Sequence, residues 1–437
     1  MERSIDYHLN QWLIEDGRKP LLLRGARQVG KTYAVRHLGK KTPHFIEINC
    51  EIINCKPVFE KDLDPQRILR DLSLLVGQRI VPGETLLFID EVQEAPRAIL
   101  ALRYFYEMMP ELQVIAAGSL LDFALEKVGI PVGRVDSMYM YPLSWLEFLL
   151  AKEETLVYNL LANNALTATS LSESVHTKFL ALLGEYLALG GMPEVVSEWT
   201  KTGDPQRCFK VQQSLVNAYR QDFEKYANKY EIKYVEILFN QVPRQLGKKF
   251  KFSETPGEFR KRELFPCLDL LIKAGVAHPI YHVSAQGLPL GADADLNKFK
   301  ALFLDIGLAQ AILGLELKDW FLNPTKAFVN QGSIVEAFVG QELLAYSEPF
   351  QKRHLYYWHR EAPNSQAEVD YILQLAGKII PVEVKSGRTG ALRGLREYLN
   401  SHPNTPYALR FSAHHYSKHD GLLSYPLYSI AKAIKSL

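Results

Sequence analysis

The sequence predicts an α/β protein, and three stretches carry this prediction. Near the N-terminus, the apolar run LLL at 21–23 precedes a glycine-rich loop and then a stretch with helical spacing. Farther on, the apolar run at 85–89 ends in two acidic residues. Near the C-terminus, runs at 355–358, 368–373 and 378–385 have the pattern of short strands. Strands that alternate with helices in this way favour a parallel sheet core followed by a second α/β domain.

The first loop has the residue types that hold a polyphosphate. Residues 25–32 read GARQVGKT, which fits G-x-x-x-x-G-K-[ST] at every fixed position. Glycines let backbone N–H groups turn inward, and a helix N-terminus adds a favourable dipole. We expect Lys31 to reach the β- and γ-phosphates of ATP, and Thr32 to ligate Mg²⁺. The alternative is a chance glycine turn. The predicted nucleotide-binding residues of this loop are Gly25, Ala26, Arg27, Gln28, Val29, Gly30, Lys31 and Thr32.

A second stretch supplies the acidic residues that ATP hydrolysis needs. Residues 85–93 read TLLFIDEVQ, an apolar strand pattern that ends in Asp90 and Glu91. We expect Asp90 to hold Mg²⁺, directly or through water, and Glu91 to polarise the water that attacks the γ-phosphate. The alternative is a buried strand that merely ends in acidic residues facing solvent. Together with the phosphate loop, the pair predicts hydrolysis and not binding alone.

Two further residues are candidates for sensing or triggering hydrolysis. The next predicted strand, LQVIAAGS at 112–119, ends in Ser119, a candidate sensor of the γ-phosphate. Alternatively, Ser119 caps the helix that follows. Arg134, in the pair Gly133-Arg134, is a candidate cationic trigger that acts within its own chain or on a neighbouring subunit. The other interpretation of Arg134 is a solvated surface arginine.

Composition restricts the class of protein. The 437 residues, of which 47% are hydrophobic and 23% charged, predict a globular chain of two to four domains. The formal net charge is only +2, so any nucleic-acid site must be a local patch. The first residues lack the apolar core of a signal peptide, and no apolar run reaches the roughly 18 residues of a membrane span. We therefore expect a cytoplasmic protein without a membrane partner.

These motifs resemble those of one family. GARQVGKT, LLFIDEVQ, AAGSLL, Gly133-Arg134, YPLSWLEF at 141–148 and YLALGGMPEVV at 186–196 are similar to bacterial and archaeal AAA-type P-loop ATPases with a C-terminal DUF4143 domain. The resemblance covers nearly the whole chain. It implies an AAA-type α/β core with ATPase activity in residues 1–150, with ATP and Mg²⁺ as cofactors, and it supplies no biological role.

The middle of the chain is predicted to contain two further parts. Residues 151–228 are mostly helical in pattern, with a glycine-rich turn at 190–193, and the resemblance implies that they form the helical lid. Residues 229–305 predict helices and then a glycine-rich hairpin, as in a winged helix. This part carries a basic cluster, namely Arg244, Lys248, Lys249 and Lys251. DNA contact is one interpretation of the cluster, and a spacer between protein parts is the other.

The last predicted domain, residues 306–437, has the residue order of a PD-(D/E)xK nuclease. A helix with Glu336 precedes a strand with Asp370 and a strand with Glu383 and Lys385. Strand alternation puts Glu383 and Lys385 on one face. We expect Asp370, Glu383 and Glu336 to ligate one or two Mg²⁺, and Lys385 to orient the attacking water. The DUF4143 segment of the family is similar in this way, which implies a restriction-endonuclease-like fold.

Three interpretations of this domain stay open at the level of sequence. They are metal-dependent cleavage, a degenerate nuclease fold used for binding, and a structural ion pair between Glu383 and Lys385. Glu368 competes with Asp370 as the carboxylate, because alternation places both on the same face. The chain is therefore predicted to couple ATP turnover to the binding or processing of DNA. The alternative is a nucleotide-dependent switch that recruits a protein partner or further copies of the chain.

Overall fold

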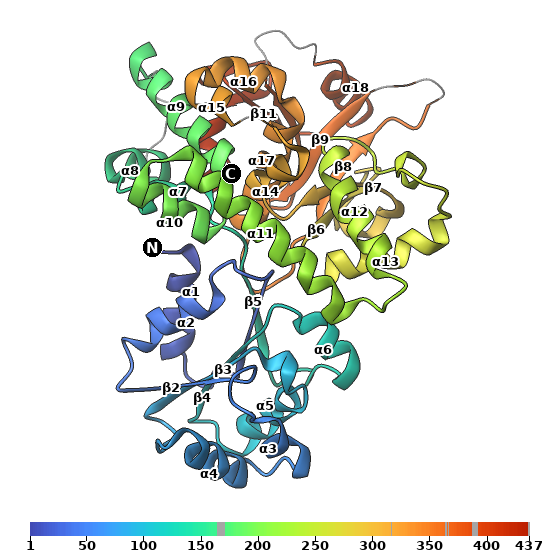
Figure 1. Ribbon diagram of the computed structural model, residues 1–437. Coiled ribbons are helices and arrows are strands. Elements are labelled where there is room, and N and C mark those ends of the chain that lie inside the picture. The colour runs from blue at the N-terminus through green and yellow to red at the C-terminus, as the bar shows by residue number, and fades with distance from the viewer. Residues whose placement is uncertain (164–170, 316, 363–364, 366, 387–391, 436–437) are drawn as a thin grey trace.

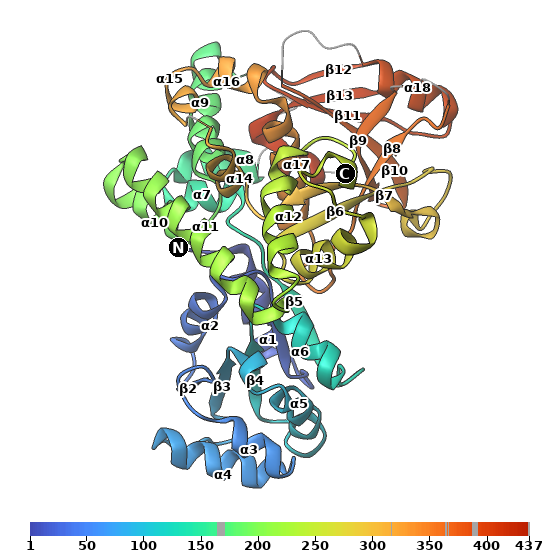
Figure 2. The same cartoon turned by 45° about the vertical axis from the view of Figure 1, so that its right-hand side comes forward.

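The computed structural model describes residues 1–163, 171–315, 317–362, 365, 367–386 and 392–435. An N-terminal parallel sheet with its helices occupies one end of the molecule, and a larger region built on a mixed sheet occupies the other (Figures 1 and 2). Helix α11 (Pro205–Tyr226) crosses between the two.

Five parallel strands form the N-terminal sheet of the described chain, in the order β2-β3-β4-β1-β5, which confirms the predicted core. Because the strands are parallel, their carboxyl ends meet at one edge, where ligands bind in open α/β sheets. The loops after β1 and β3, which carry the predicted site, lie at this edge. The strands are β1 (Leu21–Arg24), β2 (His44–Asn49), β3 (Thr85–Asp90), β4 (Gln113–Ala117) and β5 (Asp136–Tyr139).

Helices cover both faces of this sheet, and alternation along β1 shows how. Leu21 and Leu23 join a core shared with the C-terminal half of the chain, whereas Leu22 joins a second core on the opposite face. The strands are therefore apolar along their whole length, as expected for a parallel sheet buried on both sides. The helices of this part are α1 (Ser4–Ile14), α2 (Lys31–Gly39), α3 (Lys56–Lys61), α4 (Pro65–Val76), α5 (Arg97–Met108) and α6 (Leu121–Val128).

A helical segment follows, as predicted, although residues 164–170 of the predicted lid lie outside the described residues. Its turn at 190–193 packs against Asp305 and is hydrogen-bonded to it. Gly190 has φ 76°, and a Cβ there would lie 2.2 Å from Asp305 Oδ1. The Gly191 N–H donates to Asp305 Oδ2 at 2.6 Å, so the glycine pair joins this helical segment to the C-terminal region. The helices are α7 (Trp145–Ala151), α8 (Thr155–Asn163), α9 (Glu173–Leu189), α10 (Pro193–Thr202) and α11.

The C-terminal sheet has the order β12-β13-β11-β10-β9-β8-β6-β7 in the described chain. Strand β6 pairs parallel with β8, so the sheet crosses the predicted boundary between residues 305 and 306. The helices and hairpin expected of a winged helix are present, but the hairpin is not a free wing, since β8 occupies its outer edge. The strands are β6 (Ala277–His282), β7 (Asp295–Phe303), β8 (Leu355–His359), β9 (Glu368–Leu375), β10 (Lys378–Lys385), β11 (Ala408–Ser412), β12 (Ser417–His419) and β13 (Leu422–Pro426).

Helix α17 (Gly332–Ala345) packs against β7 and β10 of this sheet. Among the described residues, none of the helices combines the length and the apolar composition that a membrane crossing needs. The other helices of this region are α12 (Ile232–Arg244), α13 (Lys261–Lys273), α14 (Ile306–Leu313), α15 (Lys318–Leu322), α16 (Pro324–Asn330), α18 (Arg393–Ser401) and α19 (Ile430–Lys435). Short 3₁₀ helices lie at Val92–Glu94, Phe252–Glu254, Leu290–Asp293 and Leu427–Ser429.

Candidate nucleotide site and C-terminal cluster

The predicted phosphate loop joins β1 to α2, as the motif requires. Gly25 has φ 146°, and a Cβ there would lie 2.2 Å from the carbonyl oxygen of Met140. Gly30 has φ 101° and is the residue from which α2 begins. Both positions therefore need glycine, the first for a close backbone contact and the second for a left-handed conformation.

Lys31 lies inside the loop. Its ammonium donates to the carbonyl oxygens of Gly25 at 2.9 Å and Ala26 at 2.8 Å. Burial lowers the pKa of Lys31 to about 8, against the raising effect of Glu91 and Asp90. A phosphate group entering the loop would replace two neutral carbonyls with an anion, so the lysine is placed where added negative charge is most favourable.

Thr32 and Asp90 converge next to this lysine. The Thr32 hydroxyl donates to Asp90 Oδ2 at 2.8 Å, and the Glu91 N–H donates to Asp90 Oδ1 at 3.0 Å. Burial raises the pKa of the Asp90 carboxyl, and the Thr32 hydroxyl partly offsets that rise. A hydroxyl and a carboxylate are the oxygen donors that Mg²⁺ takes when it also binds a nucleotide phosphate, so these two residues fit the predicted ion.

Glu91 is held by a residue that sequence reasoning missed. Glu91 has φ 49°, a left-handed conformation that is uncommon for a residue other than glycine. Gln93 Nε2 donates to Glu91 Oε2 at 2.5 Å. The other amide atom, Gln93 Oε1, is buried without a partner, and a Cβ on Gly118 would lie 2.2 Å from it. Gln93 thus bridges the end of β3, which carries the predicted base, and the end of β4.

Ser119 follows β4 and is 8% exposed. It lines a small cavity of about 40 Å³ together with Gly25 of the phosphate loop. Helix α6 has Leu120 as its N-cap, so the alternative prediction that Ser119 caps this helix is wrong. Ser119 thus lies beside the loop, and its role as a sensor of the γ-phosphate stays a prediction.

Arg134 lies away from the phosphate loop. The loop follows the carboxyl end of β1, whereas Asp136, the first residue of β5, pairs with Leu21 at the amino end of β1. Arg134 precedes Asp136 and so lies beyond the opposite edge of the sheet. There its Nε donates to Glu107 at 2.8 Å, and its side chain is 44% exposed. This geometry is incompatible with the predicted action of Arg134 within its own chain.

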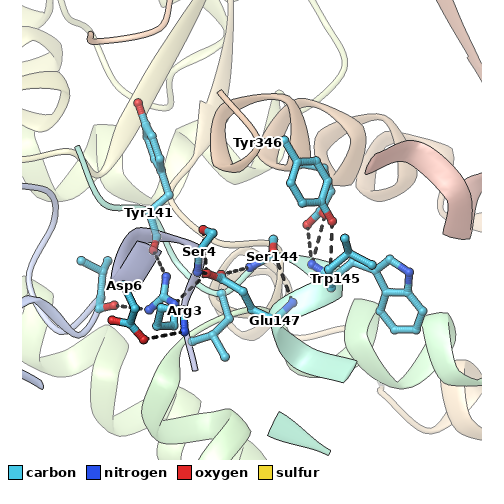
Figure 3. Close-up of polar contacts among 12 residues, drawn as sticks. Arg3, Ser4, Asp6, Tyr141, Ser144, Trp145, Glu147 and Tyr346 are labelled. Carbon is cyan, nitrogen blue, oxygen red and sulfur yellow. Dashed lines mark hydrogen bonds and ion pairs between the residues drawn. The ribbon is translucent and has the colours of Figure 1, made fainter. Parts of the chain in front are cut away.

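The phosphate loop is bonded to parts of the chain that are distant in sequence. The Arg27 guanidinium is ion-paired with Asp222 on α11, and the Tyr219 hydroxyl donates to the Arg27 carbonyl. From the other side, the Arg3 guanidinium donates to the carbonyls of Val29 at 2.9 Å and Tyr141 at 2.7 Å (Figure 3). None of these contacts is local, and the sequence alone gave no signal for them.

The polar network of Arg3 continues toward the C-terminal region, as Figure 3 shows. Arg3 is ion-paired with Glu147 at 3.1 Å, and Glu147 also accepts the Ser144 N–H at 2.8 Å, so that it caps α7. The next N–H, that of Trp145, donates to both carboxylate oxygens of Glu342 on α17 at 3.0 and 3.1 Å. Burial raises the pKa of Glu342 to about 8. The phosphate loop and α17 are thus joined through buried polar groups.

A cavity of about 350 Å³ adjoins the start of α2. It lies between the N-terminal arm, the phosphate loop and the beginning of α10, beside Gly30. Of the site residues predicted from the sequence, Gly30 alone lies in its walls, because the walls come from four separate stretches of chain. The lining residues are Met1, Arg3, Gly30, Tyr33, Leu143, Pro193, Glu194 and Ser197.

The predicted nuclease residues meet on one face of the C-terminal sheet, but around a lysine. The ammonium of Lys300, on β7, lies 2.9 Å from Glu336 Oε1 and 4.0 Å from Asp370 Oδ1, and it is also ion-paired with Glu368. Burial alone would lower the pKa of Lys300, but the three carboxylates raise it well above its ordinary value. We call Lys300, Glu336, Glu368 and Asp370 the lysine-centred cluster.

Glu383 and Lys385 lie beside this cluster and pair with each other. Lys385 Nζ is 2.5 Å from Glu383 Oε1, and Asp370 Oδ2 accepts the Val384 N–H at 2.7 Å. No group of three or more His, Cys, Asp or Glu side chains in the described part of the chain is arranged to hold a metal ion. Of the three predicted Mg²⁺ ligands, Glu336 and Asp370 are already paired with Lys300, whereas Glu383 is paired with Lys385.

The basic cluster borders the lysine-centred cluster. Its four side chains, Arg244, Lys248, Lys249 and Lys251, are exposed. Lys249 forms an isolated antiparallel bridge with Lys300, and a Cβ on Gly247 would lie 2.9 Å from Glu336 Oε2. Residues 247–249 thus run directly beside the buried cluster. A lysine in the strand KFKALFLD was the only sequence signal for Lys300, and on its own it indicates no role.

Three solved structures match parts of the chain at low sequence identity. A Walker-type ATPase of Pyrococcus abyssi is 16% identical with a TM-score of 0.46, over 71% of this chain and 95% of that one. PCH-2 of C. elegans is 16% identical with a TM-score of 0.22, over 62% and 63%. The ORC1 protein of Aeropyrum pernix, solved with DNA, is 12% identical with a TM-score of 0.28, over 71% and 90%. No curated protein matches the chain.

Three sequence families divide the chain. Residues 180–319 match a domain of unknown function, DUF8612, which spans the boundary predicted at 228/229 and that at 305/306. Residues 17–149 match the AAA domain family, and residues 331–430 match the domain of unknown function DUF4143. The chain therefore contains an AAA-type domain in its N-terminal region and a DUF4143 domain near its C-terminus.

Proposed function

We propose that the protein hydrolyses ATP and that the nucleotide state is passed from the phosphate loop to the C-terminal half. The observation that carries the proposal is the set of direct bonds from the loop to the rest of the chain, Arg27 with Asp222 and Val29 with Arg3. A nucleotide that fills the loop must reposition its backbone, and these bonds transmit that change to α11 and to the N-terminal arm.

The residues proposed for hydrolysis have separate roles. Lys31 binds the β- and γ-phosphates, and Ser119 contacts the γ-phosphate from the neighbouring strand. Glu91 accepts the proton of the water that attacks the γ-phosphate, and ADP and phosphate leave. Thr32 and Asp90 would hold Mg²⁺, which neutralises charge on the phosphates when bound. The cavity beside Gly30 is proposed to take the base, since it adjoins the loop and holds Tyr33 and Pro193 in its walls.

ATP binding and turnover by two variants test this assignment. Lys31→Ala is expected to abolish ATP binding, because the loop loses its main cation. Glu91→Gln is expected to keep binding while hydrolysis falls by about 10²–10⁴-fold, the usual contribution of a general base. Glu94→Gln, an exposed acid three residues on, is the matched control. Unchanged affinity in the first variant, or wild-type turnover in the second, would refute the proposal.

For the C-terminal half we propose binding of DNA under the control of ATP in the cytoplasm. The exposed basic cluster supports this role, because phosphate contacts by lysine and arginine supply most of non-specific affinity. Lys248→Glu with Lys249→Glu is expected to weaken DNA binding and to make it less sensitive to salt. Lys201→Glu with Lys210→Glu, exposed lysines of α10 and α11, is the control pair. Binding that is unaffected by the first pair would rule out this surface.

A second candidate partner is a further copy of the chain. Three large apolar side chains around Arg134 are exposed, namely Met108 at 61%, Ile130 at 48% and Val132 at 86%. Exposed apolar residues close in sequence to an arginine or to its partner Glu107 favour an interface between subunits. We propose that Arg134 acts there on the nucleotide of the neighbour, the one role in hydrolysis that its position in the sheet leaves open.

A further inference from the structure

The ammonium group of Lys300 lies among three carboxylates, two of which belong to the predicted metal ligands. It is surrounded by Glu336 from α17 and by Glu368 and Asp370 from β9, which approach it from two different elements. Mg²⁺ needs carboxylate oxygens at about 2.0–2.1 Å and several further ligands around it. An ammonium at 2.9 Å from one carboxylate and 4.0 Å from another fills the same space with a single positive charge.

Lys300 cannot leave this position easily. Its side chain is 1% exposed, on a central stretch of β7. The backbone of Lys249 pairs with it on one side, and the ring of Tyr357 lies 5.4 Å from its Nζ on another. Gly247 packs against Glu336, since a Cβ on Gly247 would lie 2.9 Å from Glu336 Oε2. To admit a metal ion, the protein would have to expose a charged lysine that now has three carboxylate partners.

Part of the remaining charge is also paired without a metal, although Glu383 Oε2 is buried without a hydrogen-bond partner. Lys385 neutralises Glu383 at 2.5 Å, and the Val384 N–H satisfies one oxygen of Asp370. Four carboxylates therefore face two ammonium groups and a backbone donor.

We infer that Lys300 is a built-in cation that replaces the metal ion of the nuclease-like domain, so that this domain holds its helix α17 to the sheet and does not cut nucleic acid by a metal-dependent reaction. The inference does not rest on ATP hydrolysis, since it concerns only side chains on α17, β7, β9 and β10. It leaves DNA binding at the basic cluster as a function without cleavage.

The test counts bound Mn²⁺ by electron paramagnetic resonance in the full chain without nucleotide. The wild type is compared with the double variant Glu336→Gln, Asp370→Asn, so that ions at other sites cancel. We expect both to bind the same number of ions. Loss of one bound Mn²⁺ in the double variant would overturn the inference, as would Mn²⁺- or Mg²⁺-dependent DNA cleavage by the wild type that this variant lacks.

Removal of the lysine supplies the converse test. Lys300→Met keeps the apolar stem and should gain about one Mn²⁺ per chain, because three carboxylates then share a buried space without a cation. Its Tm should be below that of the wild type and should rise when Mn²⁺ is added, whereas the wild-type Tm stays unchanged. Lys298→Met, on the same strand but with 38% of its side chain exposed and paired with Glu361, is the control and should gain nothing. A folded Lys300→Met protein that binds no additional Mn²⁺ would contradict the inference. If Lys300→Met does not fold, the Mn²⁺ count of the wild type against the Glu336→Gln, Asp370→Asn variant decides the question.

Discussion

Asp222 of α11 is ion-paired with Arg27, a residue of the phosphate loop that lies 195 positions away in the sequence. The carboxylate is almost fully buried, with 9% of its side chain exposed, and its partner is one-third exposed. The pair therefore connects the loop that receives the nucleotide to the helix that crosses between the two sheets.

Asp222→Asn is expected to weaken ATP binding by about 5–30-fold, since a charge-assisted bond of this kind contributes about 1–2 kcal/mol. The loss arises because Arg27 and the loop are no longer held in place by α11. Fluorescent-nucleotide titration measures the affinity. Glu224→Gln, an exposed carboxylate on the same helix, should leave it unchanged. Equal affinities for Asp222→Asn and the wild type would mean that the pair does not position the loop.

Gln93→Ala should lower kcat for ATP by roughly 10-fold with little change in KM, as expected when a bond of about 1.4 kcal/mol positions the general base alone. Gly118→Ala should act in the same direction, because its Cβ would collide with Gln93 Oε1. Steady-state kinetics of both variants check this relationship. A rise in KM at constant kcat would show that Gln93 acts on nucleotide binding and not on Glu91.

Arg134→Ala and Lys31→Ala should each be inactive as single proteins but recover ATPase activity when mixed. In a mixed assembly, the first variant offers an intact phosphate loop and the second an intact arginine. The activity of the mixture, measured against total protein concentration, should rise as subunits associate. Arg103→Ala, an exposed neighbour that shares Glu107, should behave as the wild type. A mixture that stays as inactive as its components would exclude action of Arg134 between subunits.

Stability should fall as pH rises from about 5 to about 8, in part because of Glu342. Burial raises its pKa from 4.5 to about 8 in the folded chain. The unfolded chain releases this proton at lower pH, so between the two values the folded state binds more protons and loses stability by up to about 1.4 kcal/mol per pH unit.

Glu342→Gln removes this titration, so the decline of Tm over that pH range should become shallower. An exposed carboxylate on the segment that follows α17 serves as the control, and Glu348→Gln should leave the slope as it is. Thermal unfolding at closely spaced pH values measures both. Parallel curves for Glu342→Gln and the wild type would show that Glu342 is ionised in the folded chain.

The candidate nucleotide site could be predicted because its signals are local. Gly25, Gly30, Lys31 and Thr32 lie within one short loop, and their types are dictated by backbone geometry and charge. Asp90 and Glu91 follow a strand whose apolar run is unmistakable. Parallel strands then place these two groups at the same edge of the sheet without further information.

The lysine-centred cluster shows where local signals end. Strand alternation correctly placed Glu368 and Asp370 on one face, and Glu336 was correctly expected nearby. The position of Lys300 in this cluster could not be predicted, because Lys300 lies in a hairpin that the sequence analysis assigned to a different domain. Its role depends on the pairing of β6 with β8, and a pairing between distant strands leaves no periodic trace in either strand.

The pairing of β6 with β8 also affects how the chain is made. Strand β6 is synthesised with one edge unpaired, and that edge stays open until the ribosome has made residues 283–354 and then β8. An open strand edge is a template for pairing with another chain. A fragment that stops before Leu355 would expose this edge, and a fragment that begins at residue 306 would expose the matching edge of β8. The C-terminal region is therefore a single folding unit. In it β6 pairs with β7 on one edge, and its other edge is covered only after β8 has been synthesised.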